Sequence, residues 1–177
     1  MRVALLIVSD IHANFEALTA VLHEIDRREI QHIVCLGDIV GYGGDPEWAV
    51  DTVMALVEEG AIALRGNHDQ AIGTASESMN AEAQAAIEWT RGRLNQAQRR
   101  FLAELPLIRE EEDRLYVHSE ASSPARWRYV QSAADAARSM IATRALVTFC
   151  GHIHQPQLYS MSVTANAPSS PRRTGGA

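Results

Sequence analysis

The chain has 177 residues, 46% hydrophobic and 21% charged, and a formal net charge of −6. This length suits one domain, the apolar content excludes intrinsic disorder for most of the chain, and the acidic balance disfavours extended nucleic acid as a partner. The apolar run over residues 3–8 is too short to span a bilayer, and no small-residue cleavage site of a secretory signal follows it. We therefore expect neither a membrane partner nor secretion.

The two cysteines, Cys35 and Cys150, lie far apart in the sequence, each in an apolar, strand-like run. Two such residues do not make the disulfide framework of a secreted domain. They are predicted to be reduced core thiols of a cytoplasmic protein.

The first half of the chain alternates short apolar runs with amphipathic stretches. Buried strands are predicted over residues 2–9, 33–36 and 61–64. Asn14 is expected to cap one helix, and a second helix is expected to begin at Asp45, with a capping carboxylate followed by proline in the first turn. This alternation indicates an α/β layered domain.

The next part of the chain is predicted to be helical over residues 80–105, with a break at Gly92. Residues 107–109 and 115–117 flank the acidic run 110–113, which indicates a hairpin with a solvated tip.

The last part of the chain is predicted to hold a helix over residues 132–144 and an apolar strand over 146–150. From Ser160 onward Pro, Gly, Ser, Thr, Asn and Arg dominate. This change of composition predicts a domain over residues 1–159 and a flexible polar tail over 160–177.

Asp, Asn or His follows each predicted strand. In the hairpin it is the second strand, residues 115–117, that such a residue follows. In an α/β sheet the ligand site lies outside the carboxyl ends of the strands, so these side chains are expected to meet at one edge. His23 and His32 lie elsewhere and are interpreted as surface or packing residues. The side chains at the strand ends are Asp10, His12, Asp38, Asn67, His68, His118, His152 and His154.

These donors predict a metal centre. Imidazole, carboxylate and amide oxygen together suit divalent Mn, Fe or Zn. Asp10-x-His12 and His152-x-His154 would each place two donors on one side of an extended segment. The candidate ligands are seven of these side chains, all except His68. Seven are too many for one tetrahedral site and suit two sites that share a bridging carboxylate, with ions about 3.5–4 Å apart that act in displacement at phosphorus.

The order of the motifs resembles the calcineurin-like metallophosphoesterase superfamily. The blocks are Asp10-Ile11-His12, Gly37-Asp38, Gly66-Asn67-His68-Asp69, His118 and Gly151-His152-Ile153-His154, and the resemblance covers about residues 3–158. It implies an α/β fold in which two mixed β-sheets form a sandwich flanked by helices.

The resemblance also implies a role for each residue. One metal ion would take Asp10, His12, Asp38 and His154; the other would take Asp38, Asn67, His118 and His152. His68 would donate a proton to the leaving oxygen, while a hydroxide bridging the two ions attacks phosphorus in line. Manganese is the expected metal, with Fe, Zn, Ni or Co as alternatives, and the substrate is expected to be a small organic phosphate.

One departure favours a particular branch of the superfamily. Gly41-Tyr42 stands where the Ser/Thr protein phosphatases have Asp-Arg, so the chain is more similar to the compact prokaryotic phosphodiesterases. A phosphoprotein phosphatase and a non-catalytic protein-binding scaffold of the same fold remain alternatives, although all seven ligand positions are present. The sequence does not separate monoesters from diesters.

A second departure follows Gly-His-x-His, where relatives continue with further strands. Residues 157–161 are expected to form one strand, so one sheet would lack C-terminal edge strands and expose an edge at which a homo-oligomer could form.

Arg126 or Arg128 could hold a second phosphate and Trp127 or Tyr129 could stack on a base, but the favoured interpretation of residues 123–129 is a surface loop. Substrate-binding residues are left unassigned.

Overall fold

The computed structural model describes residues 4–74 and 79–162. Its first half builds a parallel sheet in the order β1-β2-β3. Leu5 pairs with His32 and Val34 pairs with Ile62, so the three strands run side by side and end at the same edge. The strands are β1 (Leu5–Val8), β2 (His32–Cys35) and β3 (Ile62–Ala63).

Five helices are interleaved with and follow these strands. They are α1 (Phe15–Arg27), α2 (Pro46–Glu58), α3 (Asn67–Gly73), α4 (Ala81–Arg93) and α5 (Gln96–Glu104). Asn14 caps α1 as expected, since its side chain accepts a hydrogen bond of 2.9 Å from the Ala17 N–H. The cap expected from Asp45 is not made: α2 does begin at Pro46, but the Asp45 carboxylate bonds no amide of the helix.

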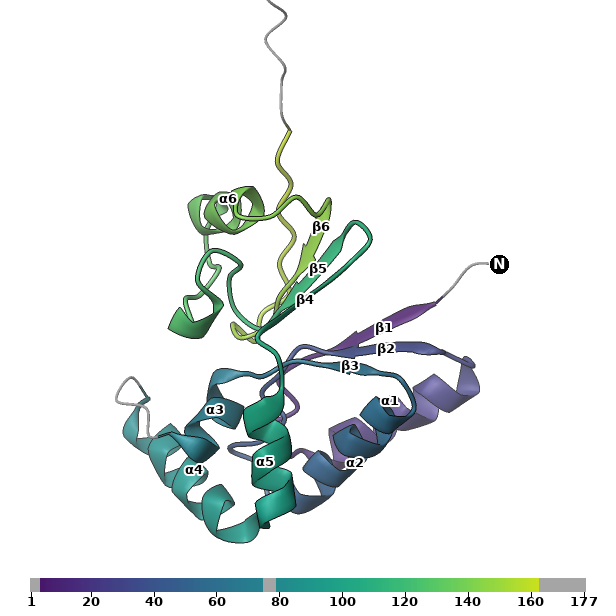
Figure 1. The fold of residues 1–177 in the computed structure, drawn as a ribbon, viewed down its shortest axis with the longest axis vertical. Coiled ribbons are helices and arrows are strands. Elements are labelled where there is room, and N and C mark those ends of the chain that lie inside the picture. Colours follow the sequence, from purple (N-terminus) through teal and green to yellow (C-terminus); the bar gives the residue numbers. More distant parts are fainter. Residues whose placement is uncertain (1–3, 75–78, 163–177) are drawn as a thin grey trace, which may run out of the picture.

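The second half builds a sheet in the order β4-β5-β6, with β4 antiparallel and β6 parallel to β5. Its elements are β4 (Ile108–Glu111), β5 (Arg114–Val117), the short 3-10 helix η1 (Pro124–Arg126), α6 (Ala133–Ile141) and β6 (Val147–Phe149). Figure 1 shows the two sheets as adjacent layers, with α1 to α5 on the far side of the first sheet and α6 beside the second. This is the expected α/β arrangement of two sheets flanked by helices.

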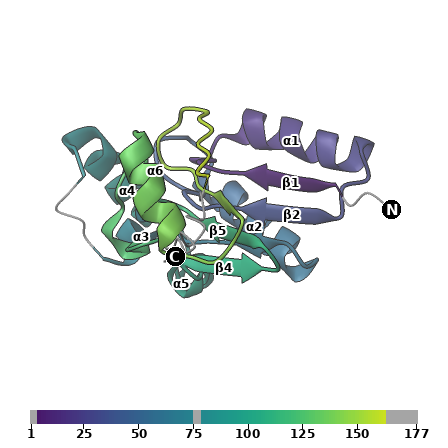
Figure 2. The ribbon, with the colours of Figure 1, turned by 90° about the horizontal axis from the view of Figure 1, so that it is seen from above.

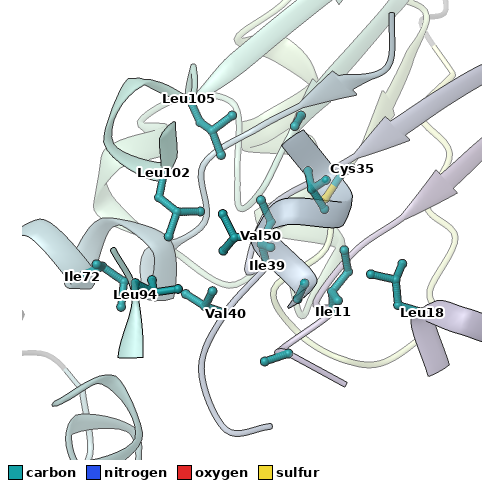
Figure 3. Close-up of a cluster of buried hydrophobic side chains, with 14 of the residues drawn as sticks. Ile11, Leu18, Cys35, Ile39, Val40, Val50, Ile72, Leu94, Leu102 and Leu105 are labelled. Carbon is teal, nitrogen blue, oxygen red and sulfur yellow. The ribbon is translucent and has the colours of Figure 1, made fainter. Parts of the chain in front are cut away.

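Two apolar clusters hold these layers together. The larger packs the first sheet onto the helices, and Figure 3 shows Val50, Leu102 and Leu105 converging on Ile39 and Cys35. The smaller lies between the sheets and consists of Val34, Leu36, Leu64 and Tyr116. Burying such side chains stabilises the fold by about 1.5–3 kcal/mol each.

A polar contact also joins the sheets. His32 of β2 lies 2.9 Å from Glu111 of β4, measured from Nε2 to the carboxylate oxygen Oε2. His23 is exposed on α1. Both histidines therefore lie away from the strand ends, as the sequence indicates.

Three further sequence-based expectations are wrong. Gly92 lies inside α4, and the helices separate at Leu94, because Asn95 provides the cap of α5 by accepting from the Gln98 N–H. Residues 157–161 form no strand. Cys150 is exposed rather than part of the core.

The edge strand β6 presents apolar side chains to solvent. Leu146 is 82% exposed and Val147 is 43% exposed, and Leu158 beyond the strand is 96% exposed. Residues 160–162 lack regular structure, and the remainder of the expected tail, 163–177, lies outside the described residues.

Candidate metal centre

The candidate ligands gather where the strands end. Figure 2 shows β1 and β2 pointing the same way, toward the side of the molecule where α3 and α6 lie. Asp10 and Asp38 follow β1 and β2, Asn67 is the first residue of α3, His118 directly follows β5, and His152 follows β6. Residues from both sheets therefore meet at one edge.

A first group of donors consists of Asp10, His12 and His154, whose potential ligand atoms all lie within 4.8 Å of one another. His154 Nε2 lies 3.3 Å from Asp10 Oδ1 and 3.1 Å from His12 Nε2. His12 Nδ1 lies 3.0 Å from the Val40 carbonyl oxygen. Because a carbonyl only accepts, Nδ1 donates, and in the neutral ring Nε2 turns its lone pair toward the group.

A second group consists of Asp38, His118 and His152, again within 4.8 Å, with Asn67 beside them. His118 Nδ1 donates to the Leu36 carbonyl oxygen at 3.1 Å, which leaves Nε2 as the acceptor in the neutral ring. This Nε2 nevertheless faces two oxygen atoms, Asp38 Oδ2 at 3.3 Å and Asn67 Oδ1 at 3.2 Å.

His152 is oriented in the same way as His12 and His118. His152 Nε2 donates to the Trp127 carbonyl oxygen at 2.9 Å, so Nδ1 is left as its acceptor. Three rings are thus tied by an N–H to a backbone carbonyl, and each offers its other nitrogen as a ligand. This outer hydrogen bond is typical of metal-binding histidine.

The donor set fits divalent cations. A lone pair facing two oxygens, or another imidazole nitrogen 3.1 Å away, is repulsive unless a proton or a cation lies between them. Nitrogen and oxygen donors of this kind suit Mn, Fe or Zn. The described residues therefore contain candidate metal-binding groups, without identifying the metal.

Asp38 links the two groups. Its Oδ2 lies 3.8 Å from His12 Nε2 and 3.3 Å from His118 Nε2, while its Oδ1 accepts the backbone N–H of His68 at 2.9 Å. Burial opposes ionisation of this carboxyl, but the nearby histidines outweigh it and lower the pKa of Asp38 to about 2. An ionised carboxylate oxygen thus points at both groups.

His68 is buried beside this carboxylate. Its ring lies 4.8 Å from the ring of His12, and burial lowers the pKa of His68 to about 4 although Asp38 opposes this shift. Its Nδ1 has no hydrogen-bond partner among the described residues. His68 is therefore a neutral imidazole that stands next to the donor groups.

Asp69, which the sequence analysis left without a role, ties two loops together. Its carboxylate accepts the backbone N–H groups of Ile39, Val40 and Gly66 at 2.9–3.2 Å. Burial and the charge of Asp38 raise the pKa of Asp69 to about 7, and the backbone donors oppose that shift. The residue holds the Asp38 loop against the start of α3.

The backbone of the donor loops is unusual, and it corrects one argument drawn from the sequence. The Asp-x-His and His-x-His segments are not extended. Five of the candidate ligands have positive φ, a conformation that is uncommon for residues other than glycine and that clusters at functional sites. They are Asp10 (56°), His12 (48°), Asp38 (52°), His152 (72°) and His154 (53°). His152 and His154 consequently join different groups rather than one.

Glycine permits the close packing of these loops. A Cβ on Gly66 would lie 2.1 Å from Asp38 Oδ1, and a Cβ on Gly41 would lie 2.3 Å from His68 Nδ1. Gly41 also has φ +94°, whereas Gly44 in the same loop has no described atom within 4 Å of its Cβ position. Gly41 and Gly44 therefore make a matched pair for substitution, one crowded and one open.

We expect Gly41→Ala to lower the free energy of unfolding by about 1–3 kcal/mol, because it combines backbone strain with a clash against His68. Gly44→Ala should change it by less than about 0.5 kcal/mol. Urea unfolding of both variants measures the difference, and equal stabilities would contradict this account of the loop.

Residues 119–129 also contribute to the site, through contacts that sequence motifs do not reveal. The Trp127 carbonyl holds His152, and the Tyr129 ring stacks on His152 with centroids 4.3 Å apart and an interplanar angle of 6°. Arg128 Nη1 lies 3.9 Å from Oε1 of the buried Glu120, so its guanidinium interacts with that carboxylate.

Known proteins identify the family. The calcineurin-like phosphoesterase superfamily domain matches residues 1–168. With the two-sheet fold and this arrangement of Asp, Asn and His, the chain belongs to that superfamily. A crystal structure of a metallophosphoesterase from Sphaerobacter thermophilus is 38% identical, covers 85% of this chain and superimposes with a TM-score of 0.73.

Two further proteins are similar to the chain, one in sequence and one in fold. An uncharacterized protein from Methanocaldococcus jannaschii is 38% identical over 131 residues, 70% of this chain. A hypothetical protein from Pyrococcus horikoshii OT3 shares the fold, with a TM-score of 0.71 at 19% identity over 81% of this chain and 67% of that structure. The present chain spans 52% of the length of the Methanocaldococcus protein and 60% of that of the Sphaerobacter structure.

No helix in the described part of the chain is both long and apolar enough to cross a bilayer.

Proposed function

We propose that the protein is a metal-dependent phosphoesterase that hydrolyses small organic phosphates with two divalent cations, manganese being the first candidate and Fe, Zn, Ni and Co the alternatives. The observation that carries this proposal is the position of Asp38 Oδ2, which faces His12 Nε2 at 3.8 Å and His118 Nε2 at 3.3 Å. One carboxylate oxygen placed between two nitrogen groups is suited to bridging two ions.

The donor atoms divide into two sets that share Asp38. The first cation would be held by Asp10, His12, Asp38 and His154, and the second by Asp38, Asn67, His118 and His152. When bound, such a pair of cations neutralises charge on phosphoryl oxygens and lowers the pKa of a water molecule for attack at phosphorus.

Groups of the chain itself would orient the metal-binding imidazoles and move a proton. The carbonyls of Val40, Leu36 and Trp127 hold three imidazoles in the tautomer that presents a lone pair. His68, neutral in the free protein, would gain proton affinity beside an anionic ester and donate a proton to the leaving oxygen. Burial by itself opposes protonation of His68, so the negative charge of the bound ester would supply the proton affinity.

The proposal is tested by assays of the protein supplemented with Mn, Fe, Zn, Ni or Co. The substrates are p-nitrophenyl phosphate, bis-p-nitrophenyl phosphate and a phosphopeptide. We expect turnover of the small esters, two ions per chain by elemental analysis, and loss of turnover after EDTA treatment. Turnover of the phosphopeptide alone would indicate a phosphoprotein phosphatase, and two bound ions without any turnover would indicate a scaffold.

We further propose a cytoplasmic location, because the thiols of Cys35 and Cys150 are both free in the described structure. The exposed apolar edge at β6 supports association between copies of the chain.

A further inference from the structure

Two half-exposed tyrosines flank the candidate metal centre. Tyr42 is 48% exposed and Tyr129 is 52% exposed. Large aromatic side chains are costly to leave in water, so a pair of them beside a polar site is informative. Neither residue belongs to the proposed ligand set.

The two rings lie at opposite ends of the histidine cluster. Tyr42 contacts the first end, with its centroid 4.9 Å from that of His12 and 4.8 Å from that of His68. Tyr129 stacks on His152 at the second end. A phosphoryl group held between the two donor groups would therefore have a tyrosine ring on either side.

Each ring leaves space for a ligand. One face of Tyr129 is covered by the parallel ring of His152, so the exposed half of the side chain is its other face and edge. A cavity of about 460 Å³ opens beside Tyr42, and Asp10 and His12 also line it. The cavity thus connects the tyrosine to the first donor group.

Both rings are held in place before any ligand arrives. Tyr42 has φ 62° and lies between Gly41 and Gly43, whose Cβ positions are filled by His68 and by the backbone of His12. Beside Tyr129, Arg128 Nη1 lies 3.9 Å from Oε1 of the buried Glu120, which also accepts hydrogen bonds from the Ser122 N–H and hydroxyl at 3.0 and 2.7 Å. Preorganised aromatic rings bind planar groups with little loss of entropy.

We propose that Tyr42 and Tyr129 form the binding site for the organic part of the phosphate ester, and that this part contains a planar aromatic group such as a nucleobase or an aryl ring. The inference rests on the proposed phosphoesterase function and names its substrate class. Tyr42, which contacts His68, borders the leaving group, and Tyr129 borders a second ester arm.

The test compares phenylphosphonate with methylphosphonate, two non-hydrolysable ligands that differ in the planar ring. Their dissociation constants for the Mn²⁺-loaded protein are measured by calorimetry. We expect phenylphosphonate to bind about tenfold tighter or more, the fold-change of one aromatic stack, and Tyr42→Leu or Tyr129→Leu to reduce that ratio toward one. The corresponding Tyr→Phe variants should retain the ratio, because the ring is kept.

Trp89→Leu is the matched control, since Trp89 is also 48% exposed but stacks with Arg93 on α4. Equal binding of the two phosphonates, or a phenyl preference that survives both Tyr→Leu changes, would overturn the inference. Hydrolysis of p-nitrophenyl phosphate and β-glycerophosphate is followed on the same samples. Turnover without a phenyl preference refutes the aromatic site alone, whereas a phenyl preference without turnover refutes the phosphoesterase function.

Discussion

Asp38→Asn is expected to lower phosphoesterase turnover about 1000-fold, because one bridging oxygen contributes several kcal/mol of charge stabilisation in a dry site. The substitution keeps the shape of the side chain and one oxygen, so the contact in which Oδ1 accepts the His68 N–H at 2.9 Å can be kept. What it removes is the negative charge that faces His12 and His118. Turnover of bis-p-nitrophenyl phosphate and the ion content of the purified variant measure the effect.

Because Asp38 would serve both cations, we expect the variant to bind each of them more weakly. Asp26→Asn, an exposed change on α1, controls for the loss of one negative charge. Near-normal turnover with two ions retained would exclude a bridging role for Asp38.

His68→Ala is expected to keep both cations and to lose about 1000-fold in turnover on esters with poor leaving groups such as β-glycerophosphate, with a smaller loss on p-nitrophenyl phosphate. A poor leaving oxygen needs a proton as its bond to phosphorus breaks, whereas p-nitrophenolate leaves without one. The ring of His68, 4.8 Å from that of His12, lies where it could make that donation once the anionic ester has raised its proton affinity.

His23→Ala, on the exposed face of α1, provides the matched histidine control. If His68→Ala instead released a cation, as judged by elemental analysis, His68 would be a ligand. The geometry allows that outcome, since potential ligand atoms of His12, Asp38 and His68 also lie within 4.8 Å of one another.

Sequence patterns predicted the α/β layers of the fold and the meeting of the candidate ligands at one edge, and both predictions have a physical reason. Parallel strands such as β1 and β2 end at one edge, so the residues after them must meet there. The cap by Asn14 followed from side-chain chemistry alone. The expected α/β fold and its superfamily are confirmed, while the roles of individual site residues stay predictions.

The features that escaped prediction depend on contacts between distant segments. Alternation along an extended chain was assumed for His152 and His154, but both have positive φ, and the His152 N–H donates to the distant Asp10 carboxylate at 3.1 Å. The stack of Tyr129 on His152 joins residues from two separate loops. Cys150 looked buried because its run is apolar, yet it follows β6 at the exposed edge of its sheet.

The left-handed backbone of the donor loops has a consequence for evolution and engineering. A histidine in this conformation raises the free energy of the native fold by about 1–2 kcal/mol, whereas glycine, asparagine and aspartate adopt it more readily. The positive φ values in the donor loops consequently lower the thermal stability of the protein. In the metal-free protein, replacing His154, whose φ is 53° and whose side chain is half exposed, with glycine should raise the melting temperature, and the same variant should turn over more slowly when cations are supplied.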